Sequence, residues 1–235
     1  MAEILKNAGL YKILALNVGV EGEHPLKTIE FAGRICHQAQ DKITEDSAGE
    51  FIKRIMGMGH ESVIEHSSIS VLFENVSLWF IHELIRHRLA SFSEKYEEDE
   101  FKAVIPFNKD PDEELVKLEI TKMMGLVPQT TNLRISFREW MELNEQMYRG
   151  LIKAGWHPED ARQVLPTATK SQIIMTANFR EWRHVFGLRC APNARWEIRR
   201  VMVNLLGDVQ QRIPVIFDDF KISEDGQSAT LKKGE

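Results

Sequence analysis

The sequence contains little cysteine and no long apolar run. These two features argue against a disulfide-rich protein, a zinc protein and a membrane-spanning protein. Cys36 and Cys190 are its only cysteines among 235 residues, and their spacing suits neither a disulfide framework nor a zinc site. No uninterrupted apolar stretch approaches the ~20 residues that a membrane-spanning helix needs. Residues 1–6 lack the charged-then-apolar layout of a secretory signal. We therefore expect a cytoplasmic protein with no membrane partner, in which both cysteines are buried.

The chain also lacks an excess of positive charge. Its formal net charge is −5, with 43% hydrophobic and 28% charged residues. This balance is enough for a sizeable core, but it argues against nonspecific nucleic-acid binding, which depends on basic surface. The sequence shows neither an internal repeat nor a low-complexity linker. Its length allows one large domain or two small ones.

Motifs of several enzyme classes are missing as well. No GxGxxG turn follows a predicted strand, so a Rossmann dinucleotide site is not expected. His60-Glu61 could begin the HExxH motif of a zinc protease, but position 64 is Ile64 rather than histidine. No Ser-His-Asp or Cys-His-Asn arrangement stands out, which disfavours covalent catalysis by a side chain. We expect no metal site.

Hydrophobic periodicity predicts a mixed α+β domain with a small antiparallel sheet and several long helices. The expected strands cover residues 11–16, 68–74 and 171–176. The expected helices cover residues 47–58, 77–89, 113–124, 133–154, 160–165, 179–189 and 195–213. This order lacks the strand–helix alternation of a doubly wound sheet. We expect one domain over residues 1–222, followed by a polar, mobile tail over residues 223–235.

The triplet Arg86-His87-Arg88 directly follows a strongly apolar segment. If the helix continues through the triplet, Arg86 and Arg88 point about 200° apart. One interpretation is a set of cations that stabilises the C-terminus of the helix. The other is a junction at which ligands or two subunits meet. The triplet alone favours the first interpretation.

Four further segments occur in a fixed order around this triplet. They are Gly59-His60-Glu61-Ser62 with Glu65-His66-Ser67, the run ARQVLP over 161–166, the run NFREWRH over 178–184 with Gly187-Leu188-Arg189, and the run ARWEIR over 194–199. Together with Arg86-His87-Arg88, they resemble the motifs of the flavin-dependent thymidylate synthases. The resemblance implies a homotetramer with FAD between subunits, held by side chains rather than by a glycine loop. It also implies methylation of C5 of dUMP, giving dTMP, with methylenetetrahydrofolate as carbon donor and NADPH as reductant.

The resemblance also implies roles for individual residues. Arg189 would be the catalytic residue, because a fixed guanidinium stabilises negative charge that develops on the N3/O4 side of uracil. Residues expected to contact FAD are Ser62, Glu65, Arg86, His87, Arg88, Glu94, Asn178, Arg180 and His184. Residues expected to contact the nucleotide are Glu83, Arg86, Lys95, Arg162 and Arg189, with Arg86 bridging the two ligands and Arg162 at the phosphate or sugar.

The sequence departs from the family pattern on the nucleotide side. Tyr96 stands in the place of a serine and Glu98 in the place of an arginine, within an acidic run over residues 94–100. A carboxylate and a phosphate charge ~6 Å apart would repel by roughly 3 kcal/mol at an effective dielectric of ~20. Either the loop points elsewhere, with Lys95 or Lys102 helping, or the nucleotide is held differently. Glu83 is a second departure, where the family usually has glutamine.

These departures leave two alternatives open. A family member acting on another pyrimidine nucleotide, such as UMP, would keep the flavin residues and alter the nucleotide pocket. A weakly active flavin-binding paralogue is the other alternative, but the presence of both Arg162 and Arg189 argues against it.

Some of the same residues have structural interpretations. Asn178 followed by Glu181 is typical of a capping box at a helix start, and this role is compatible with ligand binding. Arg180 and His184, four residues apart, are expected on one helix face. Trp182 and Phe186 are expected in the core rather than as stacking platforms.

Overall fold

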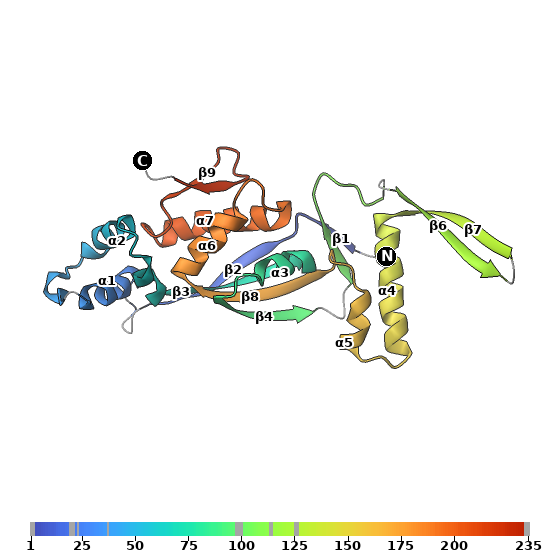
Figure 1. Ribbon diagram of the computed structural model, residues 1–235, viewed down its shortest axis with the longest axis horizontal. Helices are drawn as coiled ribbons and strands as arrows, with labels where there is room; N and C mark the ends of the chain where they lie inside the picture. The colour runs from blue at the N-terminus through green and yellow to red at the C-terminus, as the bar shows by residue number, and fades with distance from the viewer. Residues whose placement is uncertain are drawn as a thin grey trace. The chain divides into compact units, whose positions relative to one another are not determined.

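The computed structural model describes residues 3–18, 22, 24–36, 38–96, 101–112, 115–124 and 127–232. They form two compact units (Figure 1). Unit 1 contains residues 1–8, 75–79 and 96–171, and unit 2 contains residues 9–74, 80–95 and 172–235. The mixed α+β class predicted from the sequence is confirmed. None of the described helices is both long enough and apolar enough to cross a membrane.

Unit 2 is built on a four-stranded sheet. Its strand order is β2 (Leu10–Leu16), β3 (Ser68–Ser77), β8 (Lys170–Asn178) and β4 (Ala90–Tyr96). β2 pairs antiparallel with β3, and the register shifts between Ile13 and Ala15. β3 and β8 alternate buried and half-buried residues, as expected for strands whose two faces differ in environment. The last residues of β3, the first residues of β8 and Tyr96 belong to unit 1.

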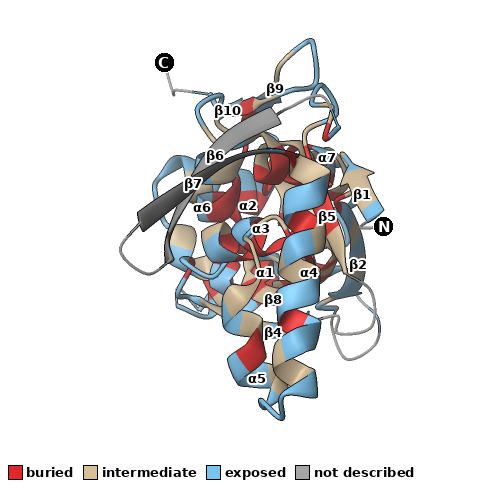
Figure 2. Cartoon of the chain, turned by 90° about the vertical axis from the view of Figure 1, so that its right-hand side faces the viewer, coloured by how far each residue is buried: buried red, intermediate tan, exposed pale blue. Residues whose placement is uncertain are grey.

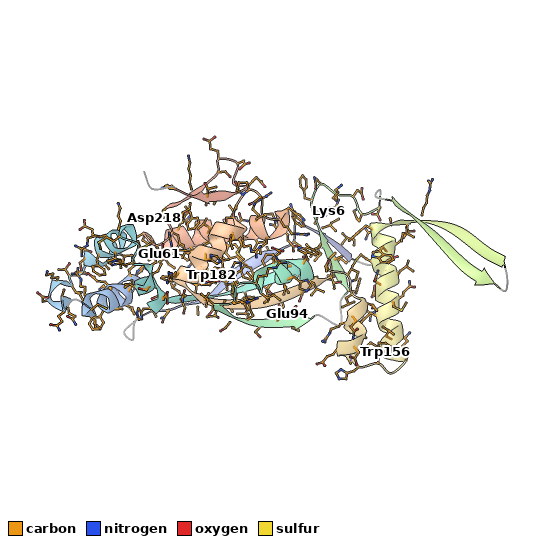
Figure 3. The ribbon with its side chains drawn as sticks, in the orientation of Figure 1. Lys6, Glu61, Glu94, Trp156, Trp182 and Asp218 are labelled. Atoms are coloured by element: carbon orange, nitrogen blue, oxygen red, sulfur yellow. The ribbon has the colours of Figure 1, made fainter. Side chains whose placement is uncertain are left out.

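Helices α6 (Phe179–Arg189) and α7 (Trp196–Arg212) pack against each other and, with this sheet, form the core of unit 2. Trp182 is fully buried on α6, and its indole Nε1 donates to the carbonyl of Ile69 on β3 at 3.1 Å (Figure 3). Its ring lies 5.5 Å from that of Phe186, which lies 5.5 Å from Phe217. The prediction that Trp182 and Phe186 belong to the core is confirmed. This packing fixes the helix that carries most of the predicted site residues.

The remaining elements of unit 2 are short. They are α1 (Pro25–Ile35), η1 (Gln40–Lys42), α2 (Ser47–Gly57), η2 (Glu61–His66), α3 (Leu78–Leu84, whose first two residues belong to unit 1), β9 (Phe220–Ile222) and β10 (Ala229–Leu231). Gly33 of α1 lies directly against Phe51 of α2, where an added Cβ would come within 2.7 Å of the ring. β9 and β10 pair antiparallel, and Ala229 is buried. The domain boundary predicted at residue 222 therefore falls inside a hairpin.

Unit 1 contains two small sheets and the helix α4. β1 (Glu3–Lys6) pairs parallel with β5 (Lys102–Ile105), and β6 (Leu115–Met124) pairs antiparallel with β7 (Val127–Ser136). α4 (Phe137–Lys153) is followed by α5 (Pro158–Ala161) and η3 (Arg162–Val164). Figure 2 shows that α4 combines buried and exposed surface, with Met141 and Tyr148 buried. A small core forms around Ala103 and Met141.

One helix prediction in unit 1 was wrong, and another was confirmed except for its start. Residues 115–124 form β6 rather than a helix, because ten residue pairs with β7 supply the backbone hydrogen bonds that a helix would have supplied locally. The helix predicted from residue 133 begins only at Phe137. Ser136 caps it, accepting from Glu139 N–H at 3.2 Å, while Glu139 accepts from Ser136 N–H at 2.6 Å. This S-x-x-E capping box is visible in the sequence.

The prediction that a helix carries Arg86-His87-Arg88 was also wrong, since α3 ends at Leu84. In a continued helix, the carbonyl of Glu83 would accept from the N–H of His87. That carbonyl instead accepts from Nη2 of Arg189 at 2.7 Å, and His87 N–H donates to Leu84. The triplet therefore lies in a turn between α3 and β4. Of the two cysteines, Cys190 is buried as predicted, but the prediction for Cys36 was wrong, since this residue is exposed at the C-cap of α1.

Candidate active site

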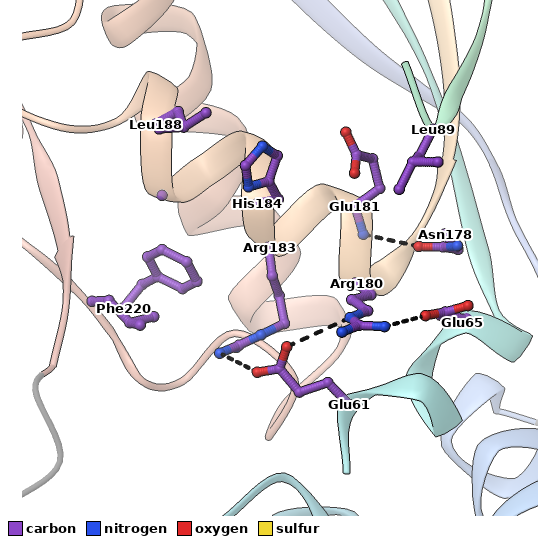
Figure 4. Close-up of a pocket in the computed structure, with 12 residues that line it drawn as sticks. Glu61, Glu65, Leu89, Asn178, Arg180, Glu181, Arg183, His184, Leu188 and Phe220 are labelled. Atoms are coloured by element: carbon purple, nitrogen blue, oxygen red, sulfur yellow. Dashed lines mark hydrogen bonds and ion pairs between the residues drawn. The ribbon is translucent and has the colours of Figure 1, made fainter. Parts of the chain in front are cut away.

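A cleft of about 770 Å³ opens in unit 2 beside α6 (Figure 4). Its volume lies within the range of small-molecule and cofactor sites. The cleft is lined by residues from η2, the turn before β4, α6 with its cap, and the β9–β10 hairpin. These residues are Glu61, Glu65, Leu89, Asn178, Arg180, Glu181, Arg183, His184, Gly187, Leu188, Phe220 and Leu231.

The start of α6 is held by a side-chain cap. Asn178 Oδ1 accepts from the backbone N–H of Glu181 at 2.8 Å (Figure 4). This is half of the predicted capping box, because the Glu181 carboxylate lies toward His87 instead of returning to the cap. The cap fixes the first turn of α6, from which Arg180, Glu181 and His184 all reach the cleft.

Ion pairs cover one wall of the cleft. Arg180 donates to Glu65 at 2.6 Å, and Glu61 lies 3.8 Å from both Arg180 and Arg183. Arg183 is buried and also pairs with Asp219 at 2.5 Å. Arg180 has half of its side chain exposed, so its pair with Glu65 contributes little stability. Arg180 could therefore leave Glu65 and pair with a bound anion with little loss of stability.

A buried polar cluster surrounds Arg189, the predicted catalytic residue. Its three guanidinium nitrogens all donate to neighbouring groups. Nη1 donates to the side-chain carboxylate of Glu83, Nη2 to the backbone carbonyl of Glu83 at 2.7 Å, and Nε to Nε2 of His87 at 3.0 Å. Arg189 therefore caps α3, and the negative charge of Glu83 lies directly against the guanidinium.

His87 connects this cluster to the cleft. Its ring is 3% exposed, its Nδ1 lies 3.5 Å from Glu181 Oε1, and its ring centroid lies 5.5 Å from that of His184. Burial, together with the nearby Arg189 and His184, lowers the pKa of His87 to about 4. His87 is therefore neutral at pH 7. Burial raises the pKa of Glu181, and His184 partly offsets this effect.

The same three residues bring possible metal ligands together. Ligand atoms of His87, Glu181 and His184 lie within 4.8 Å of one another. However, Arg189 Nε–H donates to Nε2 of His87, so the proton of the neutral ring must be on Nδ1. A protonated Nδ1 cannot ligate a metal ion. The geometry therefore favours a hydrogen-bonded network over a metal centre.

The structure brings together seven of the residues predicted from the sequence. Glu65, Asn178, Arg180 and His184 line the cleft, while Glu83, His87 and Arg189 form the cluster that adjoins it through the His87–His184 contact. Arg180 and His184 share one helix face, as predicted.

The other residues predicted from the sequence are not among those that line this cleft. Ser62 on η2 and both Arg86 and Arg88 in the turn are exposed, and Arg86 Nη2 lies 3.8 Å from Glu83. Glu94 is half-buried and Lys95 exposed on β4, while Arg162 lies in η3 of unit 1. Tyr96 ends β4, and Glu98 and Asp99 lie outside the described residues.

Two acidic residues of the site were missed. Glu61 pairs with both arginines of the wall, and Glu181 contacts His87. The signal for Glu181 was present in the sequence. Glu181, His184 and Leu188 follow one another at helical spacing, so they share one face of α6. The direct pairing of Glu83 with Arg189 had no local signal, since 106 positions separate them.

Comparison with known proteins shows the family to which the chain belongs. The sequence model of a family described as "Thymidylate synthase complementing protein" matches residues 20–215. A flavin-dependent thymidylate synthase of Geobacter sulfurreducens is 34% identical over 207 residues, which cover 83% of this chain and 82% of the relative. One from Pyrococcus abyssi is 32% identical over 194 residues, covering 80% and 75%. This chain belongs to the flavin-dependent thymidylate synthase family.

As a member of this family, the protein is a flavoprotein enzyme of the methyltransferase class, in dTMP biosynthesis. A solved structure shares its fold. The UMP/dUMP methylase PolB from Streptomyces cacaoi, bound with 5-Br dUMP, matches with a TM-score of 0.66 and 22% identity. The match covers 92% of this chain and 95% of that chain.

The cleft has the chemistry that a flavin cofactor needs. The exposed side chains of Leu89 and Leu188 offer apolar surface for a flavin ring. Arg180 offers a cation for phosphate, and His184 offers a ring N–H donor. The wall carboxylate Glu61 lies near both Arg180 and Arg183, so it stays paired with Arg183 when Arg180 turns to an anion, which reduces its repulsion of that anion. The residues present therefore fit a flavin.

Proposed function

We propose that the protein converts dUMP to dTMP by FAD-dependent methylation of C5, with methylenetetrahydrofolate as carbon donor and NADPH as reductant. The observation that carries this proposal is the spatial convergence of Glu65, Asn178, Arg180 and His184 on one cleft, beside the buried cluster of His87 and Arg189. They come from three separate segments: Glu65 from η2, His87 from the turn after α3, and the other four from α6 and its cap. A single site that needs all of them explains why they meet.

The residues divide into two groups by environment. The cleft residues Asn178, Arg180 and His184, with Glu65, would hold FAD, which supplies hydride transfer when bound. Arg180 is exposed, so it can turn from Glu65 to a phosphate group. Ser62, Arg88 and Glu94 would complete the cofactor site. Two of these, Ser62 and Arg88, are exposed, which supports a cofactor held partly by another subunit of a homotetramer.

The buried cluster would act on the nucleotide. Arg189 cannot lose its proton at neutral pH, and its contacts fix its orientation before substrate binds. Such a fixed cation stabilises charge that develops on the pyrimidine ring during attack by C5. Arg86, Glu83, Lys95 and Arg162 would complete nucleotide binding, with Arg86 reaching both ligands.

A second candidate function is methylation of another pyrimidine nucleotide, such as UMP. The observation in its favour is the carboxylate of Glu83 against Arg189, on the side of the site that would read the nucleotide. The solved neighbour with the same fold is named a UMP/dUMP methylase. The presence of both Arg162 and Arg189 argues against the third alternative, a weakly active flavin-binding paralogue.

Two measurements on the purified protein test the proposal. The flavin absorbance spectrum should show non-covalently bound FAD, several per oligomer. NADPH oxidation should then depend on added nucleotide. Bound flavin without nucleotide-dependent oxidation would identify a binding protein and contradict the enzymatic proposal.

Assembly provides an independent test. If FAD lies between subunits, its occupancy should follow assembly by mass action. Analytical ultracentrifugation of samples at several concentrations should therefore show a tetramer that carries the flavin. A monomer that binds FAD stoichiometrically would contradict a cofactor site formed between subunits.

A further inference from the structure

A line of polar contacts runs through the buried cluster from Glu181 to His87 and Arg189. Glu181 Oε1 lies 3.5 Å from Nδ1 of His87, and Nε2 of the same ring lies 3.0 Å from Nε of Arg189. Glu181 is 5% exposed and His87 3% exposed. Water therefore has little access to this line, and each group depends on its protein neighbours for polar contacts.

The chemistry of the three groups fixes where the ring proton lies. A guanidinium has donors only, so Nε2 of His87 must accept from Arg189. The ring is neutral, because burial, Arg189 and His184 lower the pKa of His87 to about 4. Its single proton is therefore on Nδ1, the nitrogen that faces the Glu181 carboxylate.

We propose that Glu181 is a positioning residue for the methylation reaction: it holds His87 in the Nδ1–H tautomer, and this tautomer holds the guanidinium of Arg189 in place. Its catalytic consequence rests on the proposed function, in which Arg189 stabilises charge on the pyrimidine. The opposite tautomer would place the Nε2–H of His87 against the Nε–H of Arg189. Two donors would then face each other, and Arg189 would lose one of its three anchors.

Glu181 is well placed for this task. Its backbone N–H is bound by Asn178 at 2.8 Å at the start of α6, so its carboxylate is presented from a fixed turn. Arg189 lies at the other end of the same helix. His87, which comes from the turn after α3, thus contacts both ends of α6 through its two ring nitrogens.

The test compares three variants of the full-length protein. Glu181→Ala removes the acceptor, whereas Glu181→Gln keeps an amide oxygen that can still accept from Nδ1–H. Glu197→Ala is the matched control. Glu197 is also 5% exposed and also lies in the first turn of a helix, but its charge acts on Arg200. This control reports what the loss of a buried carboxylate does by itself.

The first readout is ¹⁵N NMR of protein labelled in its histidine rings, with the His87 signals assigned from a His87→Gln variant. We expect protonated Nδ1 in the wild type, in Glu181→Gln and in Glu197→Ala. In Glu181→Ala we expect a substantial fraction of Nε2–H. An Nε2–H ring in the wild type, or an unchanged tautomer in Glu181→Ala, would overturn the proposal. This readout requires neither nucleotide nor turnover, so it holds whatever the substrate is.

The second readout is the kinetics of nucleotide-dependent turnover. Because misplacement of a catalytic group by about 1 Å can cost on the order of 10²-fold, Glu181→Ala should lower kcat by roughly that factor with little change in KM. Glu181→Gln should recover most of the loss. Equal losses in both variants, or an unchanged kcat in Glu181→Ala, would refute positioning. A wild type that turns over no pyrimidine nucleotide would refute the proposed function instead, and the tautomer would still be measured.

Discussion

Arg189 donates two hydrogen bonds to Glu83. One goes to the backbone carbonyl of Glu83 at 2.7 Å, and the other goes to the Glu83 side-chain carboxylate. Both side chains are largely buried, at 13% and 14% exposure. The predicted catalytic arginine is therefore also the C-terminal cap of α3. Its positive charge is partly neutralised before any nucleotide binds, and this relationship leads to the first prediction.

Glu83→Gln should strengthen nucleotide binding. Glutamine has nearly the same shape and can still accept from Arg189, but it does not neutralise the guanidinium. We expect dUMP to bind up to about tenfold more tightly, or ~1.4 kcal/mol, as measured by calorimetry. Glu145→Gln on α4 is the control, because it removes the same charge from an ion pair in unit 1. Weaker binding in Glu83→Gln would contradict this prediction, because it would show that the negative charge of Glu83 assists nucleotide binding.

Removal of hydrogen-bond donors from the flavin site should lower FAD occupancy. His184 lines the cleft, and Arg88 is expected to contact FAD from the exposed turn. We expect His184→Ala and Arg88→Ala each to purify with less flavin, measured by absorbance relative to protein. Arg149→Ala removes an exposed cation of α4 and serves as the control. Full occupancy in both site variants would contradict the assignment of these residues.

The burial of neutral His87 should make the protein less stable in mild acid. Its folded pKa of about 4 lies below the ordinary value of 6.5, so the unfolded chain binds the proton more readily between these values. Stability should therefore fall as the pH drops from about 6.5 to about 4, by up to ~3 kcal/mol from this residue. Above about pH 7.5, where the imidazole is neutral in both states, His87 should contribute almost no pH dependence.

This dependence is measurable by urea unfolding across that pH range. His87→Gln replaces the ring by a neutral side chain that cannot titrate, so the slope between pH 4 and 6.5 should become smaller. An identical slope in the wild type and His87→Gln would show that other groups cause the acid sensitivity.

The acidic run over residues 94–100 gives a prediction that rests on its departure from the family's sequence pattern. Replacing Tyr96 by serine and Glu98 by arginine restores the family pattern and exchanges repulsion for attraction. We expect the double variant to bind dUMP more tightly, by an amount that shrinks with added salt. Unchanged or weaker binding would mean that this loop does not face the phosphate, and the choice of substrate would have to be reconsidered.

Local signals predicted α6 well and the region around His87 poorly. The Asn178 cap and the apolar spacing after it define α6 over residues 179–189, as the structure confirms. The end of α3 is set by Arg189, which takes the Glu83 carbonyl from 106 positions away, and no local pattern can reveal this. β6 was mistaken for a helix for a similar reason, since its partner strand decides its state.

The candidate site could be predicted by residue identity but not by geometry. The sequence motifs named Arg180, His184 and Arg189, which the structure places on one helix. They could not show that Glu83 neutralises Arg189 or that Glu181 faces His87. Both contacts join segments whose distance in space depends on how the whole of unit 2 folds.

The central claim is tested most directly by the release of tritium from C5 of labelled dUMP, with UMP, dCMP and CMP assayed in parallel. With FAD, NADPH and methylenetetrahydrofolate present, we predict release that requires all three, with dUMP as the best substrate. Arg189→Ala should keep its flavin but lose activity by about 10²–10³-fold, the usual effect of removing one preorganised electrostatic donor. No release from any of the four nucleotides, or undiminished release in Arg189→Ala, would contradict this account.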